Sequence, residues 1–90
     1  MAISLEKLPS VVEALVGMGA RTVLLFGSAA ESPERANDID LAVEGIPASR
    51  MLDADVEVYR ILQQPFDLVS REENPEFYDI IRRYGRVVYG

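Results

Sequence analysis

The chain has 90 residues, of which 49% are hydrophobic and 27% charged. Domains usually run to roughly 100–150 residues, so this length suits one compact domain and excludes two. Nine Lys and Arg against fifteen Asp and Glu give a formal net charge of −6. This charge repels phosphate backbones and disfavours nucleic-acid binding as the main function. The chain contains no Cys and no His. Any metal site must therefore hold a hard cation on oxygen ligands.

The N-terminal residues lack the basic start and the long apolar stretch of a signal peptide. No apolar run approaches the ~18 residues that a membrane span needs. We therefore expect no membrane association and a cytoplasmic protein.

The first half of the chain is predicted to alternate between helices and strands. Apolar residues recur three and four apart over residues 5–18, which predicts an amphipathic helix. Residues 21–26 are apolar on both alternating faces, as in a strand that is covered on both sides. Residues 29–37 carry Pro and several charges, which predicts a short helical turn and an exposed loop. Residues 38–43 alternate strictly between polar and apolar, which predicts a second strand.

The second half continues the alternation. We expect a helix over residues 48–63, a strand over residues 66–69, a helix that opens at Asn74-Pro75 and a short strand over residues 87–89. The apolar stripes expected to face the core are Leu52, Val56, Tyr59 and Leu62 on the first helix and Phe77, Ile80, Ile81 and Tyr84 on the second. The aromatic residues Phe26, Tyr59, Phe66, Phe77 and Tyr84 are predicted to pack in the core. This order predicts an α/β (α+β) fold, a small mixed β-sheet with helices packed against it, and a single domain over residues 1–90.

Three carboxylates fall on the polar faces of predicted strands. Asp38 and Asp40 are two residues apart and so share a strand face, about 6.5–7 Å apart along the chain. Their mutual repulsion is costly without a cation to offset it. Asp67 stands between Phe66 and Leu68, which leaves its carboxylate on the opposite face of its own strand. If the two strands are adjacent, the three carboxylates converge and suit Mg²⁺ or Mn²⁺. The alternative is a solvated strand face on which Asp38 serves a turn.

Gly27-Ser28 follows directly after a predicted buried strand. A glycine there lets the backbone approach a phosphate closely, and the serine hydroxyl can donate a hydrogen bond to it. The alternative is that a strand-to-helix turn needs a small residue in any case. The chain has no Walker-type Gly-Lys-Ser/Thr sequence that would strengthen the phosphate interpretation.

Other charged segments have simpler explanations. Asp53 and Asp55 point about 200° apart on a helix, so they cannot hold one ion and are predicted to lie on a solvated helix face. Arg82, Arg83 and Arg86 form a basic cluster at a predicted helix end, where positive charge complements the helix dipole.

Taken together, the motifs resemble the minimal nucleotidyltransferase family of the DNA polymerase β-like superfamily. The segments that carry this resemblance are Phe26–Ala30, Asn37–Val43 and Phe66–Val69. They match the family's order of Gly-Ser, a spacer of about ten residues, Asp-x-Asp and a later third Asp. The resemblance implies the nucleotidyltransferase fold. It further implies that Asp38 and Asp40 bind two Mg²⁺ ions, that Asp67 completes the catalytic metal site, and that Gly27 and Ser28 contact the phosphates of ATP.

The resemblance also implies a role in toxin–antitoxin pairs. Such short family members act as antitoxins of helical HEPN proteins, and some transfer AMP from ATP to a tyrosine of that partner. A homo- or hetero-oligomer is compatible with this role. The chain departs from the family where basic residues are common, with Ala29 directly after Gly-Ser and Glu31 two positions later. Arg35 is the candidate substitute as a phosphate clamp. The alternative function is a catalytically weak or inactive subunit that neutralises or assists a helical partner by binding alone.

Overall fold

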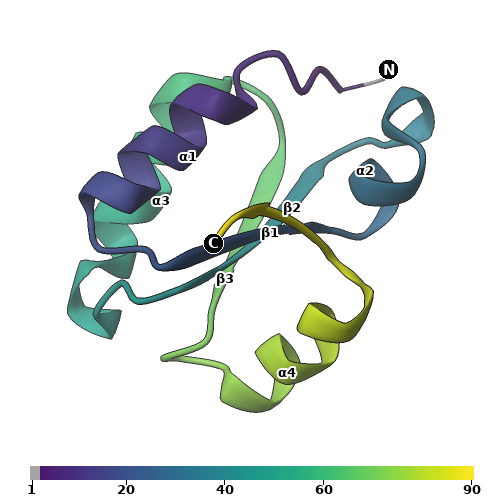
Figure 1. Ribbon diagram of the computed structural model, residues 1–90. Helices are drawn as coiled ribbons and strands as arrows, with labels where there is room; N and C mark the ends of the chain where they lie inside the picture. Colours follow the sequence, from purple (N-terminus) through teal and green to yellow (C-terminus); the bar gives the residue numbers. More distant parts are fainter. Residues whose placement is uncertain (1–2) are drawn as a thin grey trace.

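The computed structural model describes residues 3–90 and confirms the predicted alternation of helices and strands (Figure 1). The helices are α1 (Leu8–Gly17), α2 (Ser28–Glu31), α3 (Met51–Leu62) and α4 (Pro75–Tyr84). The strands are β1 (Thr22–Phe26), β2 (Ile39–Glu44), β3 (Phe66–Ser70) and β4 (Arg86–Tyr89). Two short 3-10 turns, Pro33–Arg35 and Ala48–Arg50, precede β2 and α3. Met1 and Ala2, which belong to the segment inspected for a signal peptide, lie outside the described residues. Among the helices of residues 3–90, none has the length and apolar character to cross a membrane.

The four strands form one mixed sheet in the order β3-β2-β1-β4. Strand β1 runs antiparallel to both of its neighbours, and β2 runs parallel to β3. Parallel neighbours need a crossover connection, which α3 provides. Helices α1 and α3 pack side by side on one face of the sheet, and α4 covers part of the other face (Figure 1).

The core is divided between the two faces of the sheet. The larger part lies under α1 and α3, and Ile39, Leu41 and Val43 of β2 point into it, as their alternation predicts. The smaller part lies under α4 and includes Leu24 and Ala42. Because side chains alternate along a strand, Asp40 shares the α4 side with Ala42. The polar site therefore begins where the apolar cover of α4 ends.

The predicted core face of α3 is confirmed for Leu62 and wrong for the other three residues. Leu52, Val56 and Tyr59 are exposed, with 75%, 52% and 61% of their surface accessible. The helix instead buries a stripe made of Met51, Ala54, Val58 and Leu62. Two apolar stripes run along this helix, and the one that contains the small Ala54 packs against α1 and the sheet.

The predicted core face of α4 is also wrong in part. Ile81 is buried as expected, but its buried partner is Tyr78, whereas Phe77, Ile80 and Tyr84 are exposed. The ring of Tyr78 packs in one cluster with Leu24, Ala42 and Val69, where the small side chain of Ala42 leaves room for a large one. The prediction that the aromatic residues pack in the core is therefore wrong for Tyr59, Phe77 and Tyr84. Phe26 and Phe66 are half-buried.

The hydroxyl oxygen of Tyr78 is buried and has no hydrogen-bond partner. It is the one side-chain polar atom within residues 3–90 of which this is true. Burial is the main cause that raises the pKa of this hydroxyl, and the nearby charge of Glu44 adds to it. Removing a buried, unpaired hydroxyl removes its desolvation cost. We therefore expect Tyr78→Phe to raise the free energy of unfolding by about 1 kcal/mol in urea denaturation. A loss of stability would mean that the hydroxyl has a partner in solution.

Candidate functional site

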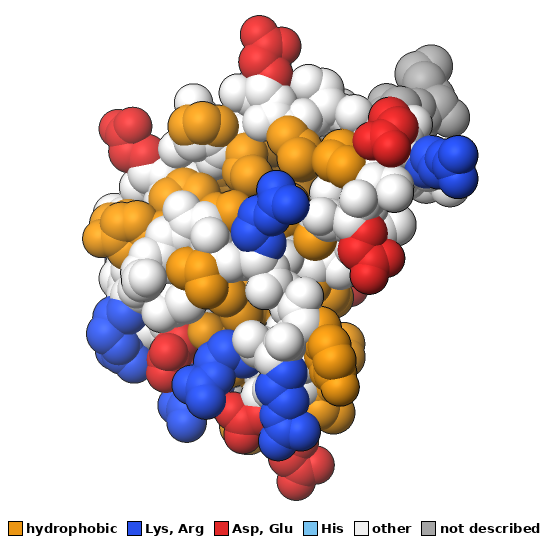
Figure 2. Space-filling model, turned by 45° about the vertical axis from the view of Figure 1, so that its right-hand side comes forward, with side chains coloured by type: hydrophobic (Ala, Val, Ile, Leu, Met, Phe, Trp, Pro, Cys, Tyr) orange, Lys and Arg blue, Asp and Glu red, His pale blue; other side chains and the backbone are white. Residues whose placement is uncertain are grey.

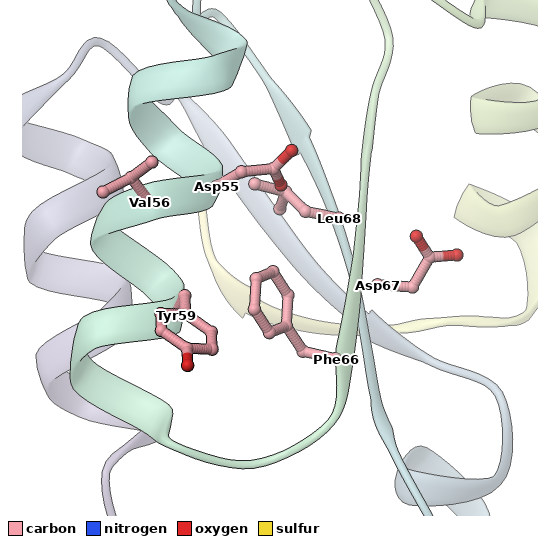
Figure 3. A pocket seen from close by; sticks show the side chains of 6 residues that line it. All are labelled: Asp55, Val56, Tyr59, Phe66, Asp67 and Leu68. Carbon is pink, nitrogen blue, oxygen red and sulfur yellow. The ribbon is translucent and has the colours of Figure 1, made fainter.

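Two predicted site residues lie directly opposite one another in the sheet. Asp40 of β2 pairs with Asp67 of the parallel strand β3, and Phe26 of β1 is the partner of Asp40 on the other side. Residues in register point to the same face, and neighbouring strands lie about 4.8 Å apart. Figure 3 shows the carboxylate of Asp67 on the side of β3 away from α3. The structure therefore brings Asp40 and Asp67 together on the α4 side of the sheet.

Asp38 joins this pair from the bend that precedes β2. Asp38 and Asp40 are both half-buried, and the charge of Asp38 acts on the carboxyl group of Asp40. The pKa of Asp40 is raised, first by burial of its carboxyl group and then by the negative charges of Asp38 and Asp67. Asp40 therefore lies within reach of the negative charge of both other carboxylates.

Gly27 packs directly on the carboxylate of Asp40. Its φ of +71° lies in the left-handed region that favours glycine, and a Cβ atom at this position would collide with Oδ2 of Asp40. Ser28 follows as the first residue of α2 and is exposed. The Gly-Ser turn and the Asp-x-Asp strand are therefore parts of one site.

Arg35 is the predicted site residue for which the structure shows no contact with the other predicted site residues. It ends an exposed 3-10 turn, and no ion pair within the described residues includes it. Ala29, the residue after Gly-Ser, is fully buried in the main core, so this position has no room for a long basic side chain.

The donor set fits a hard cation only in part. Within residues 3–90, no group of three acidic side chains stands ready-made to hold one metal ion. Asp40 nevertheless has a second carboxylate on either side, Asp38 along the chain and Asp67 across the strands. Mg²⁺ is commonly bound by one or two carboxylates, with waters and substrate phosphates as its other ligands. A pair that includes Asp40 therefore suits this ion, and the convergence of all three ligands on it stays a prediction.

A hollow on the opposite side of β3 is a separate feature. Five of its lining side chains, Asp55, Val56, Tyr59, Phe66 and Leu68, lie between α3 and β3 (Figure 3). Asp55 is half-buried rather than fully solvated, and its pKa is raised by burial and then by the charges of Asp67 and Glu73. Asp67 is the sixth residue that lines this hollow, although its carboxylate lies on the other side of β3.

A second hollow lies beside the Gly-Ser turn, between α2 and α4. Phe77, Ile80 and Tyr84 of α4 line it together with Gly27 and Ser28. The three α4 side chains were predicted to lie in the core, so the sequence did not indicate this hollow. The available signal was that α4 carries more large apolar residues than one buried stripe can hold.

The fold of this chain is similar to that of proteins whose structures have been solved. No family model and no curated protein matches the chain. A crystal structure of a mutant of the toxin–antitoxin MntA-HpeT contains a chain that aligns with a TM-score of 0.71 at 18% identity, over 98% of this chain and 73% of that one. A crystal structure of a toxin–antitoxin with AMP-PNP aligns with a TM-score of 0.71 at 19% identity, over 98% and 74%. At this identity the likeness concerns the fold, and it agrees with the family resemblance of the three motifs. The chain therefore has the mixed α/β nucleotidyltransferase fold.

Proposed function

We propose that this protein is a Mg²⁺-dependent nucleotidyltransferase. In this proposal it transfers AMP from ATP to a tyrosine hydroxyl of a helical, HEPN-type partner in the cytoplasm and thereby acts as an antitoxin. The observation that carries the proposal is the register of β2 and β3, which sets Asp40 beside Asp67 on one face. Gly27 adds to it, because this residue packs on the Asp40 carboxylate with no side chain in between.

The proposed roles of the residues follow from their positions. Asp38, Asp40 and Asp67 would hold two Mg²⁺ ions, which when bound neutralise the triphosphate and lower the pKa of the acceptor hydroxyl. Gly27 allows the phosphates to approach the backbone, and Ser28 donates a hydrogen bond to them. Arg35 is the candidate cation that reaches the phosphates from the loop.

The transfer itself is an in-line displacement. The acceptor oxygen forms a bond to the α-phosphorus, and the bond from that phosphorus to the oxygen shared with the β-phosphate breaks, which releases pyrophosphate. Asp67 is the most exposed of the three carboxylates and accepts the proton of the hydroxyl. The chain has no His that could take this role.

The neighbouring structures support both the nucleotide and the partner. Both belong to toxin–antitoxin complexes, and one of them contains AMP-PNP, an analogue of ATP. A second protein would supply the acceptor.

A second function is favoured by one specific observation. The buried Ala29 and the acidic Glu31 leave the Gly-Ser turn without an adjacent positive charge. A subunit that neutralises its helical partner by contact alone, with weak or no catalysis, would need no such charge.

Transfer of label separates the two functions. The protein is incubated with Mg²⁺, α-phosphate-labelled ATP and host lysate that contains the helical partner. We expect one labelled protein band, and we expect Asp38→Asn to reduce its label by at least about 100-fold. Asp53→Asn is the matched control, because Asp53 is exposed on α3, away from the site. Partner neutralisation that survives in Asp38→Asn, with no label in the wild type, would establish the binding-only function instead.

A further inference from the structure

The hollow between α2 and α4 combines a polar floor with an aromatic wall. Gly27 and Ser28 form the floor, and Phe77, Ile80 and Tyr84 form the wall. Its volume is about 420 Å³, within the range of pockets that hold small molecules. Figure 2 shows hydrophobic side chains exposed at the lower end of the molecule, where α4 lies in Figure 1, among Lys, Arg, Asp and Glu side chains. This end of the molecule therefore exposes apolar surface between charges of both signs.

The aromatic wall is not explained by the packing of the core. Tyr84 is 82% exposed and Phe77 is 47% exposed, while Tyr78 and Ile81 already bury the other side of α4. The ring of Phe77 is nevertheless fixed, because it packs edge-to-face on Phe26 at a centroid distance of 6.2 Å and an interplanar angle of 88°. A ring that is exposed and held in place is suited to stack with a ligand at little entropic cost.

The wall is physically continuous with the candidate site. Phe26 supports the ring of Phe77 from below, directly precedes Gly27 and is the strand partner of Asp40. A ligand whose charged end lies at Gly27 can therefore contact the aromatic wall without leaving this hollow. Glu31 also lines this hollow, and its carboxylate repels phosphate groups from that part.

We propose that this hollow seats the nucleobase of the nucleotide, stacked against Tyr84 and Phe77. The inference rests on the proposed function and deepens it by assigning the other end of the substrate. The phosphates lie at Gly27 and Ser28, and the planar, uncharged base lies between α2 and α4. Stacking depends on the face of the ring, which every base has, so these side chains give affinity for a base rather than selectivity among bases.

Equilibrium binding in the presence of MgCl₂ tests the proposal. ATP and inorganic tripolyphosphate, which has no base, are titrated in a calorimeter into the wild type and into Tyr84→Leu and Phe77→Leu. We expect each variant to bind ATP about tenfold more weakly and tripolyphosphate as tightly as the wild type does. Tyr84→Phe keeps the ring and should keep the affinity for ATP. Tyr59→Leu is the matched control, because Tyr59 is 61% exposed on α3, on the other side of the sheet.

The outcomes are distinguishable. If the wild-type protein binds ATP and the variants Tyr84→Leu and Phe77→Leu bind ATP equally tightly, the base seat is overturned and the proposed function is left intact. Variants that keep ATP affinity but lose the complex with the helical partner would assign this wall to the protein interface, which also overturns it. Wild type that binds neither ATP nor tripolyphosphate would overturn the proposed function and the base seat together. The variant at Tyr84 changes an exposed side chain, so its result does not depend on refolding of the core.

Discussion

Replacing Asp40 by Asn is expected to abolish AMP transfer and at the same time to make the protein more stable. Asp40 stands between Asp38 and Asp67 and is the carboxylate on which Gly27 packs. Asparagine removes the charge that a divalent cation needs, so transfer should fall by at least about 100-fold. It also removes repulsion between like charges on neighbouring strands, which should raise the free energy of unfolding by about 0.5 kcal/mol. Label transfer and urea denaturation measure the two effects.

The stability effect has a definite dependence on pH. The pKa of Asp40 is raised in the folded protein above its ordinary value of 3.8, by burial and by the neighbouring carboxylates. The folded state therefore holds this proton more tightly than the unfolded state does, and ionisation of Asp40 costs stability as the pH rises through that raised pKa. Asp40→Asn should match the wild type in stability well below pH 3.8, where Asp40 is protonated in both states, and exceed it at pH 7. Asp55 is the other carboxyl group with a raised pKa, and it is present in both proteins, so its effect cancels in the comparison.

Two results would contradict this account of Asp40. A stability difference that stays constant between pH 4 and pH 7 would mean that the carboxylates do not repel one another in solution. Undiminished label transfer by Asp40→Asn would remove this residue from the site. Asp53→Asn removes an equal charge from an exposed position in the first turn of α3, where a carboxylate favours the helix, so it should leave the transfer unchanged and should not raise the stability at pH 7.

Gly45→Ala is expected to cause the largest loss of stability of any variant considered. Gly45 has a φ of +115°, which L-residues with a side chain rarely adopt. A Cβ atom there would collide with the carbonyl oxygen of Gly19 and lie 2.8 Å from the amide nitrogen of Arg21. Both contacts are with backbone, so neither can be relieved by a change of rotamer. We expect a loss of about 3 kcal/mol in free energy of unfolding, which corresponds to roughly 10–20 °C in Tm for a domain of this size.

Gly17→Ala is the matched control for this variant. Gly17 is the last residue of α1, and a Cβ atom at this position would meet no other atom within 4 Å. Alanine is a better helix former than glycine, so this variant should be neutral or more stable by up to about 1 kcal/mol. Thermal unfolding measures the two variants side by side. A Gly45→Ala variant as stable as Gly17→Ala would show that the clash at Gly45 does not occur.

The strands could be predicted from the sequence more reliably than the helix faces. Strict alternation along residues 38–43 places Ile39 in the core and Asp40 on the opposite side, because only two faces are available to a strand. A helix has more directions, and α3 and α4 each carry two apolar stripes. The sequence does not say that Ala54 and Tyr78, rather than Tyr59 and Tyr84, are buried.

The residues of the candidate site could be named from the sequence, but their arrangement could not. The motifs indicate three carboxylates and a Gly-Ser turn, yet the pairing of Asp40 with Asp67 depends on which strands become neighbours. The contact of Gly27 with Asp40 likewise depends on the antiparallel register of β1 and β2. The aromatic wall of Phe77 and Tyr84 could not be separated from core residues by hydrophobicity alone.

Strand β3 has consequences beyond the site, because within residues 3–90 it forms one edge of the sheet and pairs only with β2. An unpaired edge can recruit a strand from another molecule, and a charge near its middle makes that aggregation costly. Asp67 is this charge, between the half-buried Phe66 and Leu68. Any change that neutralises Asp67 therefore removes a carboxylate of the candidate site and also exposes a template for edge-to-edge aggregation. Asp40 lies on the inner strand β2, so its neutralisation exposes no strand edge.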